Sequence, residues 1–467
     1  MTATASQIWS RTIALIVASA FFMETLDATV VLTALPAIAS SFGTTTLEAS
    51  LCVTAYLVAM AVCVPAAGWC AERFGARTVF AAAVGVFTVA SLMCALAPTL
   101  ATFVAARVLQ GAAAAFMSPV GRLVVLRETP TPRLIEAIGT ITWPGLIAPV
   151  IGPVLGGAIV TYASWHWIFL LNLPLGLIGI WLALRFIPRR DERVKKRFDA
   201  AGFVLTGLAL AGLIMGLTQL GEQRQPGMGA ALLLGLGGAC ALLAVWHARR
   251  VDQPMLDLQA LGVRTFAFSI ATAGFASRIA INAAPYLLPL MFQIAFKMTP
   301  LQAGVMVLVY MVGNLSMKSA TTWVLRRFGF RQVLVVNGAL CAASLFGCGS
   351  LAPGDPQLLV YAVLLVAGMT RSMNFTATAT LAYVDVPAGQ RAGASALATM
   401  MQQLAMTLSV ALAAFALSAS QSWRAATELA LADFRLVWLA MGLVMLLTAA
   451  SALRLPHHAG AALTRKP

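Results

Sequence analysis

The sequence predicts an all-α integral membrane protein in which fourteen transmembrane helices form two six-helix bundles with two additional helices between them. Three observations support this fold class: an apolar composition, fourteen long apolar runs, and a segment that recurs in both halves. Of the 467 residues, 60% are hydrophobic and 10% are charged, against roughly 45–50% and 25% in soluble domains. A chain with a mean hydropathy of +0.88 would expose large apolar patches in water. This composition excludes a cytosolic enzyme, a disordered scaffold and a disulfide-linked secreted module.

The apolar runs define the predicted helices, because a transmembrane helix needs about 20 mostly apolar residues. They cover 13–38, 49–70, 78–97, 100–126, 136–162, 167–187, 200–220, 229–248, 266–294, 301–324, 332–352, 358–383, 393–420 and 436–455. The runs are continuous rather than alternating, which excludes a membrane β-barrel. Glu24 and Asp27 interrupt the first run, which is also longer than the apolar core of a signal peptide, so we predict an uncleaved first helix.

The basic residues predict the orientation of the chain. When the N-terminus and every even-numbered loop are assigned to one side, 22 of the 31 Lys and Arg residues lie on that side, four lie on the other and five lie inside the runs. The basic side is expected to be cytoplasmic. We therefore predict a multi-pass protein of the bacterial cytoplasmic (inner) membrane with both termini in the cytoplasm. Since the net charge of +15 follows the topology, it does not indicate nucleic-acid binding.

A repeated segment locates the two halves. Residues 68–77 and 322–331 share Trp, Arg, Phe, Gly and Arg in register. The first copy follows the second run and the second copy follows the tenth, so the offset is eight helices, and runs 7 and 8 are the insertion. Parallel repeats of this kind are typical of transporters with a substrate path between the halves. The predicted domains are an N-terminal bundle (1–187), linkers with the inserted helices (188–256), a C-terminal bundle (257–456) and a short tail (457–467).

Five segments together resemble the major facilitator superfamily, and within it the fourteen-helix drug:proton antiporters of the EmrB/QacA type. They are the loop 2–3 segment 68–77, the helix-1 segment 26–36, the helix-4 segment Arg107-Val108-Leu109-Gln110-Gly111, the helix-5 segment 148–157 and the segment 165–174. Glu72 replaces the usual Asp of the first segment, Ala148 replaces the leading Gly of the helix-5 segment, and His166 replaces an Arg. The resemblance covers essentially the whole chain. It implies proton-coupled export by alternating access.

Two of these segments have a physical interpretation of their own. A carboxylate beside arginines at cytoplasmic helix ends can form a charge network that breaks and re-forms as two halves rock, although it can equally be a basic anchor with a glycine turn. This gating network would comprise Gly68, Glu72, Arg73, Gly75 and Arg77. In helix 5, small residues at this spacing allow close helix packing, and the resemblance implies an antiporter role. The residues concerned are Gly152, Pro153, Gly156 and Gly157.

Ionisable residues inside membrane helices are costly and are candidates for function. Glu24 and Asp27 are three residues apart, roughly on one face of the first helix. Asp27 is the main candidate for a titrating carboxylate, and an Asp27–Arg107 contact that forms and breaks could move a proton. The alternative is a static ion pair that holds helices 1 and 4 together. Glu24 is a second candidate for proton coupling, and it could instead face outer water.

The C-terminal half has bases inside its helices but no comparably deep acid. The five intramembrane bases of the whole chain are Arg107, Arg122, Arg278, Lys318 and Arg371, against two acids. A net positive cavity favours anions, such as carboxylates or metal-carboxylate chelates. The predicted cavity residues are Arg122, Arg278, Lys318, Arg371, Asn374 and Gln402. Alternatively, these bases bind helix-end carbonyls or extend to the membrane surface.

No motif in the sequence indicates catalysis, ATP hydrolysis, a cofactor or a metal. Gly313 to Ser319 lacks the Gly before Lys318 that a phosphate loop requires. We therefore predict a non-enzymatic, proton-coupled exporter of small amphiphilic or drug-like molecules, without cofactors, whose partners are the substrate, protons and the lipid bilayer. Outer-membrane efflux partners are not identifiable from the sequence. The alternatives are efflux of organic anions and, in a different class, a membrane sensor or scaffold without transport.

Overall fold

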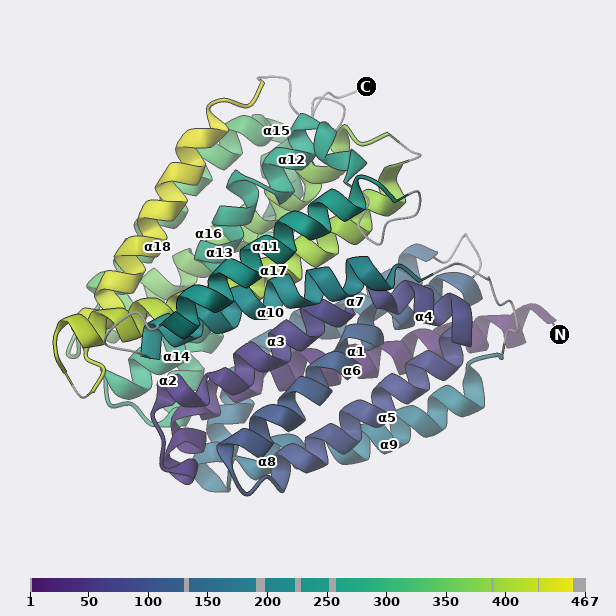
Figure 1. Cartoon of the computed structure of the whole chain (residues 1–467), viewed down its shortest axis with the longest axis horizontal. Coiled ribbons are helices and arrows are strands. Elements are labelled where there is room, and N and C mark those ends of the chain that lie inside the picture. The colour runs from purple at the N-terminus through teal and green to yellow at the C-terminus, as the bar shows by residue number, and fades with distance from the viewer. Residues whose placement is uncertain are drawn as a thin grey trace. The chain divides into compact units, whose positions relative to one another are not determined.

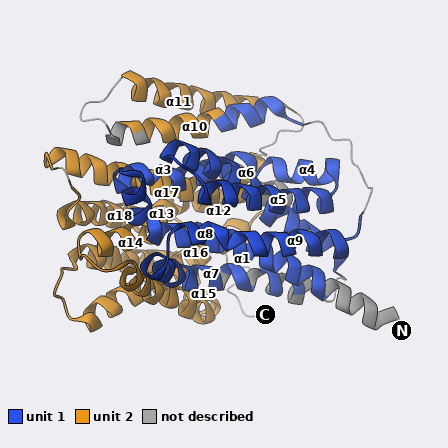
Figure 2. Cartoon of the chain, turned by 90° about the horizontal axis from the view of Figure 1, so that it is seen from below, with its two compact units in different colours: residues 1–207 blue, residues 208–467 orange. Residues whose placement is uncertain are grey.

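The protein is almost entirely helical in the residues that the structure describes (Figure 1). The computed structural model describes residues 2–129, 134–189, 198–222, 228–251, 258–387, 390–426 and 428–456. These residues form two compact units, residues 1–207 and 208–467 (Figure 2). This division by compactness does not test the finer domain boundaries predicted above, which stay predictions.

Unit 1 is built around two long helices, α1 and α6. Its helices are α1 (Thr2–Phe42), α2 (Thr46–Ala49), α3 (Leu51–Cys63), α4 (Ala66–Phe74), α5 (Ala76–Ala95), α6 (Leu100–Glu128), α7 (Leu134–Tyr162), α8 (His166–Leu170), α9 (Asn172–Phe186) and the start of α10 (Ala200–Glu222). Helix α1 packs against α6, α7 and α9, while α6 packs against α3 and α5. Side chains from α1, α3, α5, α6 and α9 therefore meet inside this unit.

Unit 2 contains the rest of α10 and the C-terminal helices. They are α11 (Met228–Ala248), η2 (Gln259–Gly262), α12 (Arg264–Ile270), α13 (Ala273–Asn282), α14 (Ala284–Ile294), α15 (Pro300–Ser350), α16 (Gln357–Val384), α17 (Arg391–Trp423) and α18 (Leu431–Ala452). Helix α15 packs along α16 and α18, and α13 packs against α17 and α18. The apolar runs thus form helices, which satisfy their backbone hydrogen bonds internally, as lipid requires.

The all-α membrane fold class is confirmed, because twelve helices of the described residues are long and apolar enough to span a membrane. The other two of the fourteen predicted runs do not appear as separate spans among these twelve. Helix α15 has 51 residues and contains both the tenth and eleventh runs, and the described apolar part of α7 is the shorter segment Ile147–Tyr162. Some runs are broken by kinks, so run 9 becomes α12, α13 and α14. The count of fourteen spans stays a prediction.

Helix α15 is interrupted where the tenth and eleventh runs were predicted to separate. A straight 51-residue helix would be about 77 Å long, more than twice the roughly 30 Å of the hydrocarbon core. Gly329 breaks it with φ 74° and ψ 162°. Gly75 between α4 and α5 has φ 88° and ψ 131°. Both glycines adopt a backbone conformation that is strongly disfavoured for any residue with a Cβ.

The repeated segment has the same local geometry in each unit. Trp69 and Phe74 form an edge-to-face pair with ring centroids 5.8 Å apart, and Trp323 and Phe328 do so at 6.3 Å. The Arg that ends each copy donates to a carbonyl near the C-terminal end of another helix: Arg77 to Leu184 of α9, and Arg331 to Leu453 after α18, at 2.8 Å. The match in sequence is therefore also a match in structure.

The repeat extends beyond the ten matched residues. Tyr56 and Tyr310 precede the two copies by the same number of residues. A Cβ on Gly111 of α6 would lie closer than 3.0 Å to the Tyr56 carbonyl, and a Cβ on Gly368 of α16 would meet the Tyr310 carbonyl in the same way. In each unit, a helix pair thus approaches through a glycine and a tyrosine backbone.

Glycines also bring α10 and α11 into close contact. A Cβ on Gly212 or Gly237 would lie within 3.0 Å of backbone atoms of the other helix, and Gly216 faces Leu234 equally closely. Only 17% of the residues in an apolar 18-residue stretch of α11 are buried. Helices α10 and α11 therefore form a closely packed pair, and most residues in the apolar stretch of α11 are not buried.

The positive φ angles at Gly75 and Gly329 lead to a stability prediction. We expect Gly75→Ala and Gly329→Ala each to lower the free energy of unfolding by about 1–3 kcal/mol, the cost of a non-glycine residue in such a conformation. Denaturation in mixed detergent micelles would measure this change. The control Gly235→Ala, which places a Cβ in open space on α11, should leave stability unchanged or slightly higher. Equal effects for all three variants would contradict the prediction.

Candidate functional site

A buried ion pair joins α1 and α6 inside unit 1. Arg107 Nη1 lies 2.6 Å from Asp27 Oδ2, and both side chains are 0% exposed. The contact left open by the sequence is therefore present in the structure. The pair combines charge with a hydrogen bond, the arrangement that a buried charge needs in a low-dielectric environment.

Two amide side chains complete the coordination of Asp27. Gln110 Nε2 donates to Asp27 Oδ1 at 3.1 Å, and Asn172 Nδ2 of α9 donates to the same oxygen at 2.9 Å. Both amides also donate to Ser91 of α5, at 2.7 and 3.1 Å. The sequence prediction omitted these three residues, although Gln110 and Asn172 lie within segments that carried the family resemblance. Asp27 thus accepts hydrogen bonds from donors on α6 and α9.

Arg107 has further contacts that hold its guanidinium in place. Its Nη1 donates to Gln110 Oε1 at 2.5 Å, and its Nε lies 3.5 Å from the Cys52 carbonyl. Its guanidinium carbon lies 4.4 Å from the centroid of the Tyr56 ring, a geometry in which the ring face attracts a cation. Within the described residues, Nη2 has no hydrogen-bond partner. Side chains of the five helices α1, α3, α5, α6 and α9 therefore meet in one polar network.

Glu24 lies one turn before Asp27 on α1 and has a different environment. It is 6% exposed, and Ser118 Oγ of α6 donates to its Oε2 at 2.7 Å. The positive charge of Arg122, one turn further along α6, acts on Glu24, but no cation of the described residues lies within the 4.0 Å of an ion pair with it. Glu24 is therefore buried in the bundle and does not face open water.

The predicted gating segment lies around the kink between α4 and α5. Gly75 makes the turn, Arg73 is exposed, and Gly68 and Glu72 lie on α4. Arg77 holds the start of α5 against the end of α9 through the Leu184 carbonyl. The turn explains the glycine, whereas the gating role stays a prediction.

The helix-5 glycines bring α7 against α1. A Cβ on Gly152 would lie closer than 3.0 Å to Thr29, and a Cβ on Gly156 would meet Thr33 and the Val30 carbonyl equally closely. Pro153 lies inside the same helix and Gly157 follows Gly156. The close packing predicted for this segment is therefore present, and it lies beside the helix that carries Asp27. The antiporter role stays a prediction.

Unit 2 contains a cluster of cations on α13, α15 and α16. Arg278 is 2% exposed, and its guanidinium carbon lies 5.7 Å from the Phe375 ring centroid. Arg371 Nη2 lies 3.3 Å from Asn282 Oδ1, and the charge of Arg371 acts on Lys318. Among the described residues, Arg278 Nε, Arg278 Nη1 and Arg371 Nε have no hydrogen-bond partner. No carboxylate of those residues forms an ion pair with this cluster.

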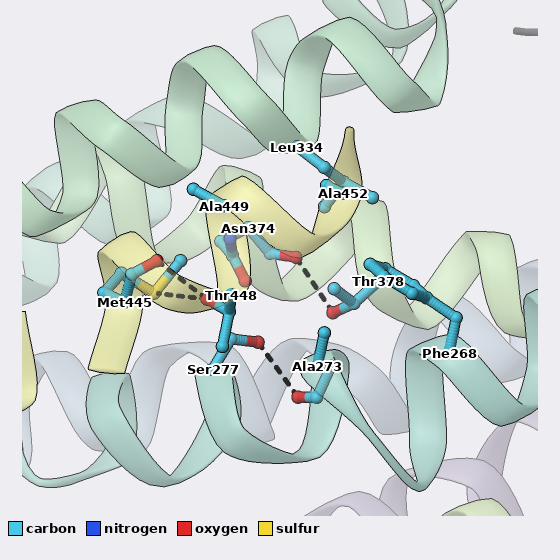
Figure 3. Close-up of a pocket in the computed structure, with 11 residues that line it drawn as sticks. Phe268, Ala273, Ser277, Leu334, Asn374, Thr378, Met445, Thr448, Ala449 and Ala452 are labelled. Carbon is cyan, nitrogen blue, oxygen red and sulfur yellow. Dashed lines mark hydrogen bonds between the residues drawn. The ribbon is translucent and has the colours of Figure 1, made fainter. Parts of the chain in front are cut away.

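The remaining predicted cavity residues are not all gathered at this cluster. Asn374 lines a small cavity of about 10 Å³ (Figure 3), together with Ser277, Thr378 and Thr448. That volume is at the lower limit for a single water molecule, so the space that Asn374 faces is too small for a drug-like molecule. Gln402 is half-buried on α17, and Arg122 is exposed on α6 in unit 1. The contacts thus place Arg278 and Arg371 where α13 meets α16, and Lys318 lies close enough for the charge of Arg371 to act on it.

The part of the chain with described coordinates has no group of three His, Cys, Asp or Glu residues that could hold a metal ion. Its seven cysteines, all of them described, are free. The functional groups that it brings together are instead an ion-pair network in unit 1 and a cation cluster in unit 2. Each consists of charged groups inside apolar helices, which the cost of burying charge makes unusual outside functional sites.

Membrane helices with a buried charge network and an internal repeat define a multi-pass membrane transporter. A family model described as the Major Facilitator Superfamily matches residues 17–410. The chain belongs to that superfamily. It is 35% identical over 466 residues to a protein of Escherichia fergusonii, covering 98% of this chain and 97% of that protein, and 37% identical over 414 residues to one of Cronobacter sakazakii, covering 88% and 86%. Both bear the name MdtD and a multidrug-resistance designation.

A solved structure shows the same fold at low sequence identity. The crystal structure of a D-xylose–proton symporter matches with a TM-score of 0.68 and 15% identity, covering 96% of this chain and 98% of that chain. At this identity the likeness concerns the fold alone. It confirms the prediction of a major-facilitator fold.

Proposed function

We propose that this transporter exports small amphiphilic, drug-like molecules from the bacterial cytoplasm in exchange for protons, by alternating access across the inner membrane, with both termini cytoplasmic. The observation that carries the proposal is the network of Asp27 and Arg107, with Glu24 beside it, because buried carboxylates on a helix that contacts several others can link protonation to helix movement. The multidrug-resistance designation of the MdtD relatives supports the substrate class.

Proteoliposomes with an imposed proton gradient and an internal pH-sensitive dye would test the proposal. We expect ethidium to trigger proton flux in the wild-type protein. Asp27→Asn should lower that flux at least tenfold, because it leaves the buried charge of Arg107 without its counter-charge. Glu428→Gln removes an exposed acid outside the spans and is the matched control. Wild-type protein that moves no proton with any probe, and binds none of them, would favour the sensor or scaffold alternative.

A second candidate function, efflux of organic anions, is favoured by the cation cluster of unit 2. Buried guanidinium N–H groups without partners are costly, and a carboxylate would satisfy them with charge-assisted hydrogen bonds. The candidates therefore differ in the charge of the molecule that is exported.

The same liposomes would distinguish the two candidates. If the second is correct, succinate or tricarballylate, with or without Mg²⁺, will trigger proton flux, and Arg278→Gln or Arg371→Gln will reduce it at least tenfold. The control Arg435→Gln changes an exposed base on α18 and should have no effect. Flux with ethidium alone, unchanged in Arg278→Gln and Arg371→Gln, would exclude anion efflux.

A further inference from the structure

The two carboxylates of α1 differ in what their neighbours can do when a proton binds. Among the described residues, the three side chains that hydrogen-bond to Asp27 do so through N–H groups, from Arg107, Gln110 and Asn172. Guanidinium and amide N–H groups donate and cannot accept. A proton added to Asp27 would therefore face donors on both oxygens and would leave Arg107 without a counter-charge.

Glu24 has a partner that can serve either protonation state. Its described hydrogen bond is to the Ser118 hydroxyl, at 2.7 Å, and a hydroxyl both donates and accepts. When Glu24 is charged, Ser118 donates to it. When Glu24 is protonated, its O–H can donate to Ser118 after the hydroxyl rotates. Binding and release of a proton therefore require no movement of heavy atoms at this contact.

We propose that Glu24 carries the coupled proton, while Asp27 serves as the counter-ion of Arg107. The inference rests on the proposed proton-coupled function and identifies its proton-binding group. It reverses the ranking from the sequence, which placed Asp27 first. The proton binds one Glu24 carboxylate oxygen and leaves from the same oxygen, so no other reactant is needed.

The charged and titratable groups around Glu24 are consistent with this division. On α6, the positive charge of Arg122 attracts Glu24 without forming an ion pair with it, and Arg107 is already paired with Asp27. On α3, the Tyr56 hydroxyl is buried without a described hydrogen-bond partner and lies within electrostatic range of both Glu24 and Asp27. From α9, Asn172 is neutral, and between residues 147 and 162 of α7 the only titratable side chain is Tyr162, at the exposed end.

Two other titratable residues belong to elements that contact α1 at its far end. Glu48 of α2 and His166 of α8 lie near Phe42, whose ring is 5.7 Å from that of Trp165. Glu24 is about five turns of helix away from Phe42. Among the side chains that the structure describes, the groups that can respond to its protonation are therefore Arg122, Tyr56 and the Asp27–Arg107 pair.

Infrared difference spectroscopy on the purified full-length protein tests this assignment without a substrate. The carbonyl stretch of a protonated, buried carboxyl group should disappear as the pH rises in the wild type. We expect this band to be absent in Glu24→Gln and retained in Asp27→Asn. A band that is lost in Asp27→Asn and retained in Glu24→Gln, or the absence of any titrating buried carboxyl in the wild type, would overturn the inference.

Two further variants guard against misfolding. Ser118→Ala keeps both carboxylates and should displace the pH midpoint of the Glu24 band, whereas Glu428→Gln should leave it in place. Size-exclusion chromatography verifies that each variant is folded. If Glu24→Gln does not fold, an unchanged midpoint in Ser118→Ala overturns the inference.

Transport measurements then separate this inference from the proposed function. In liposomes, Glu24→Gln should lower the ethidium-triggered proton flux at least tenfold. The same variant should still exchange labelled for unlabelled ethidium when no proton gradient is imposed. Wild-type protein that moves no protons would refute the proposed function, while the infrared result would still decide which carboxyl titrates. Proton flux that persists in Glu24→Gln would refute the inference and leave the proposed function standing.

Discussion

Arg107→Gln is expected to lower the free energy of unfolding by about 3–5 kcal/mol, the usual cost of removing one partner of a buried ion pair. Asp27 would keep its amide donors but lose its only counter-charge among the described residues. Reversible unfolding in mixed detergent micelles would measure the change. Arg122→Gln, on an exposed position of the same helix, should change the free energy by less than about 0.5 kcal/mol.

A double-mutant cycle makes this prediction specific to the pair. In Asp27→Asn/Arg107→Gln both charges are gone, so the loss of stability should be smaller than the sum of the two single losses by at least about 1 kcal/mol. Strict additivity would mean that the two side chains do not interact in the folded protein, and the pair would then lose its place in the network.

Gly111→Ala and Gly368→Ala are expected to have the second largest effect, a loss of about 3 kcal/mol each. Both would place a Cβ closer than 3.0 Å to a tyrosine carbonyl, and a backbone atom cannot rotate away as a side chain does. Overpacking of this kind costs typically about 1–3 kcal/mol, and relief here requires α6 to separate from α3, or α16 from α15.

Thermal unfolding of the purified protein would check this prediction. Gly85→Ala makes the same change on α5, where the nearest atom is the flexible Cδ1 of Ile180 at 3.7 Å, so it should be tolerated. Similar stability in Gly111→Ala, Gly368→Ala and Gly85→Ala would show that the helices separate freely, contrary to the close packing described here.

The sequence allowed prediction of features that depend on local composition. Apolar runs located the helices, and the repeated segment lies at the two kinks that the structure shows at Gly75 and Gly329. The partners of Asp27 were harder to predict. Gln110 and Asn172 are separated from Asp27 by more than 80 residues, and their convergence depends on how α1, α6 and α9 pack. The deep burial of Glu24 was uncertain for the same reason, since helix periodicity gives a face but not its neighbour.

The pairing of α10 with α11 has a consequence for how the chain enters the bilayer. Two apolar helices in direct glycine contact can insert as one hairpin, crossing and returning together. A hairpin crosses an even number of times, so adding or removing it leaves the helices that follow on their original side. If α10 and α11 are an insertion in the repeat, as the sequence predicts, their even number leaves the second half of the chain in its original orientation.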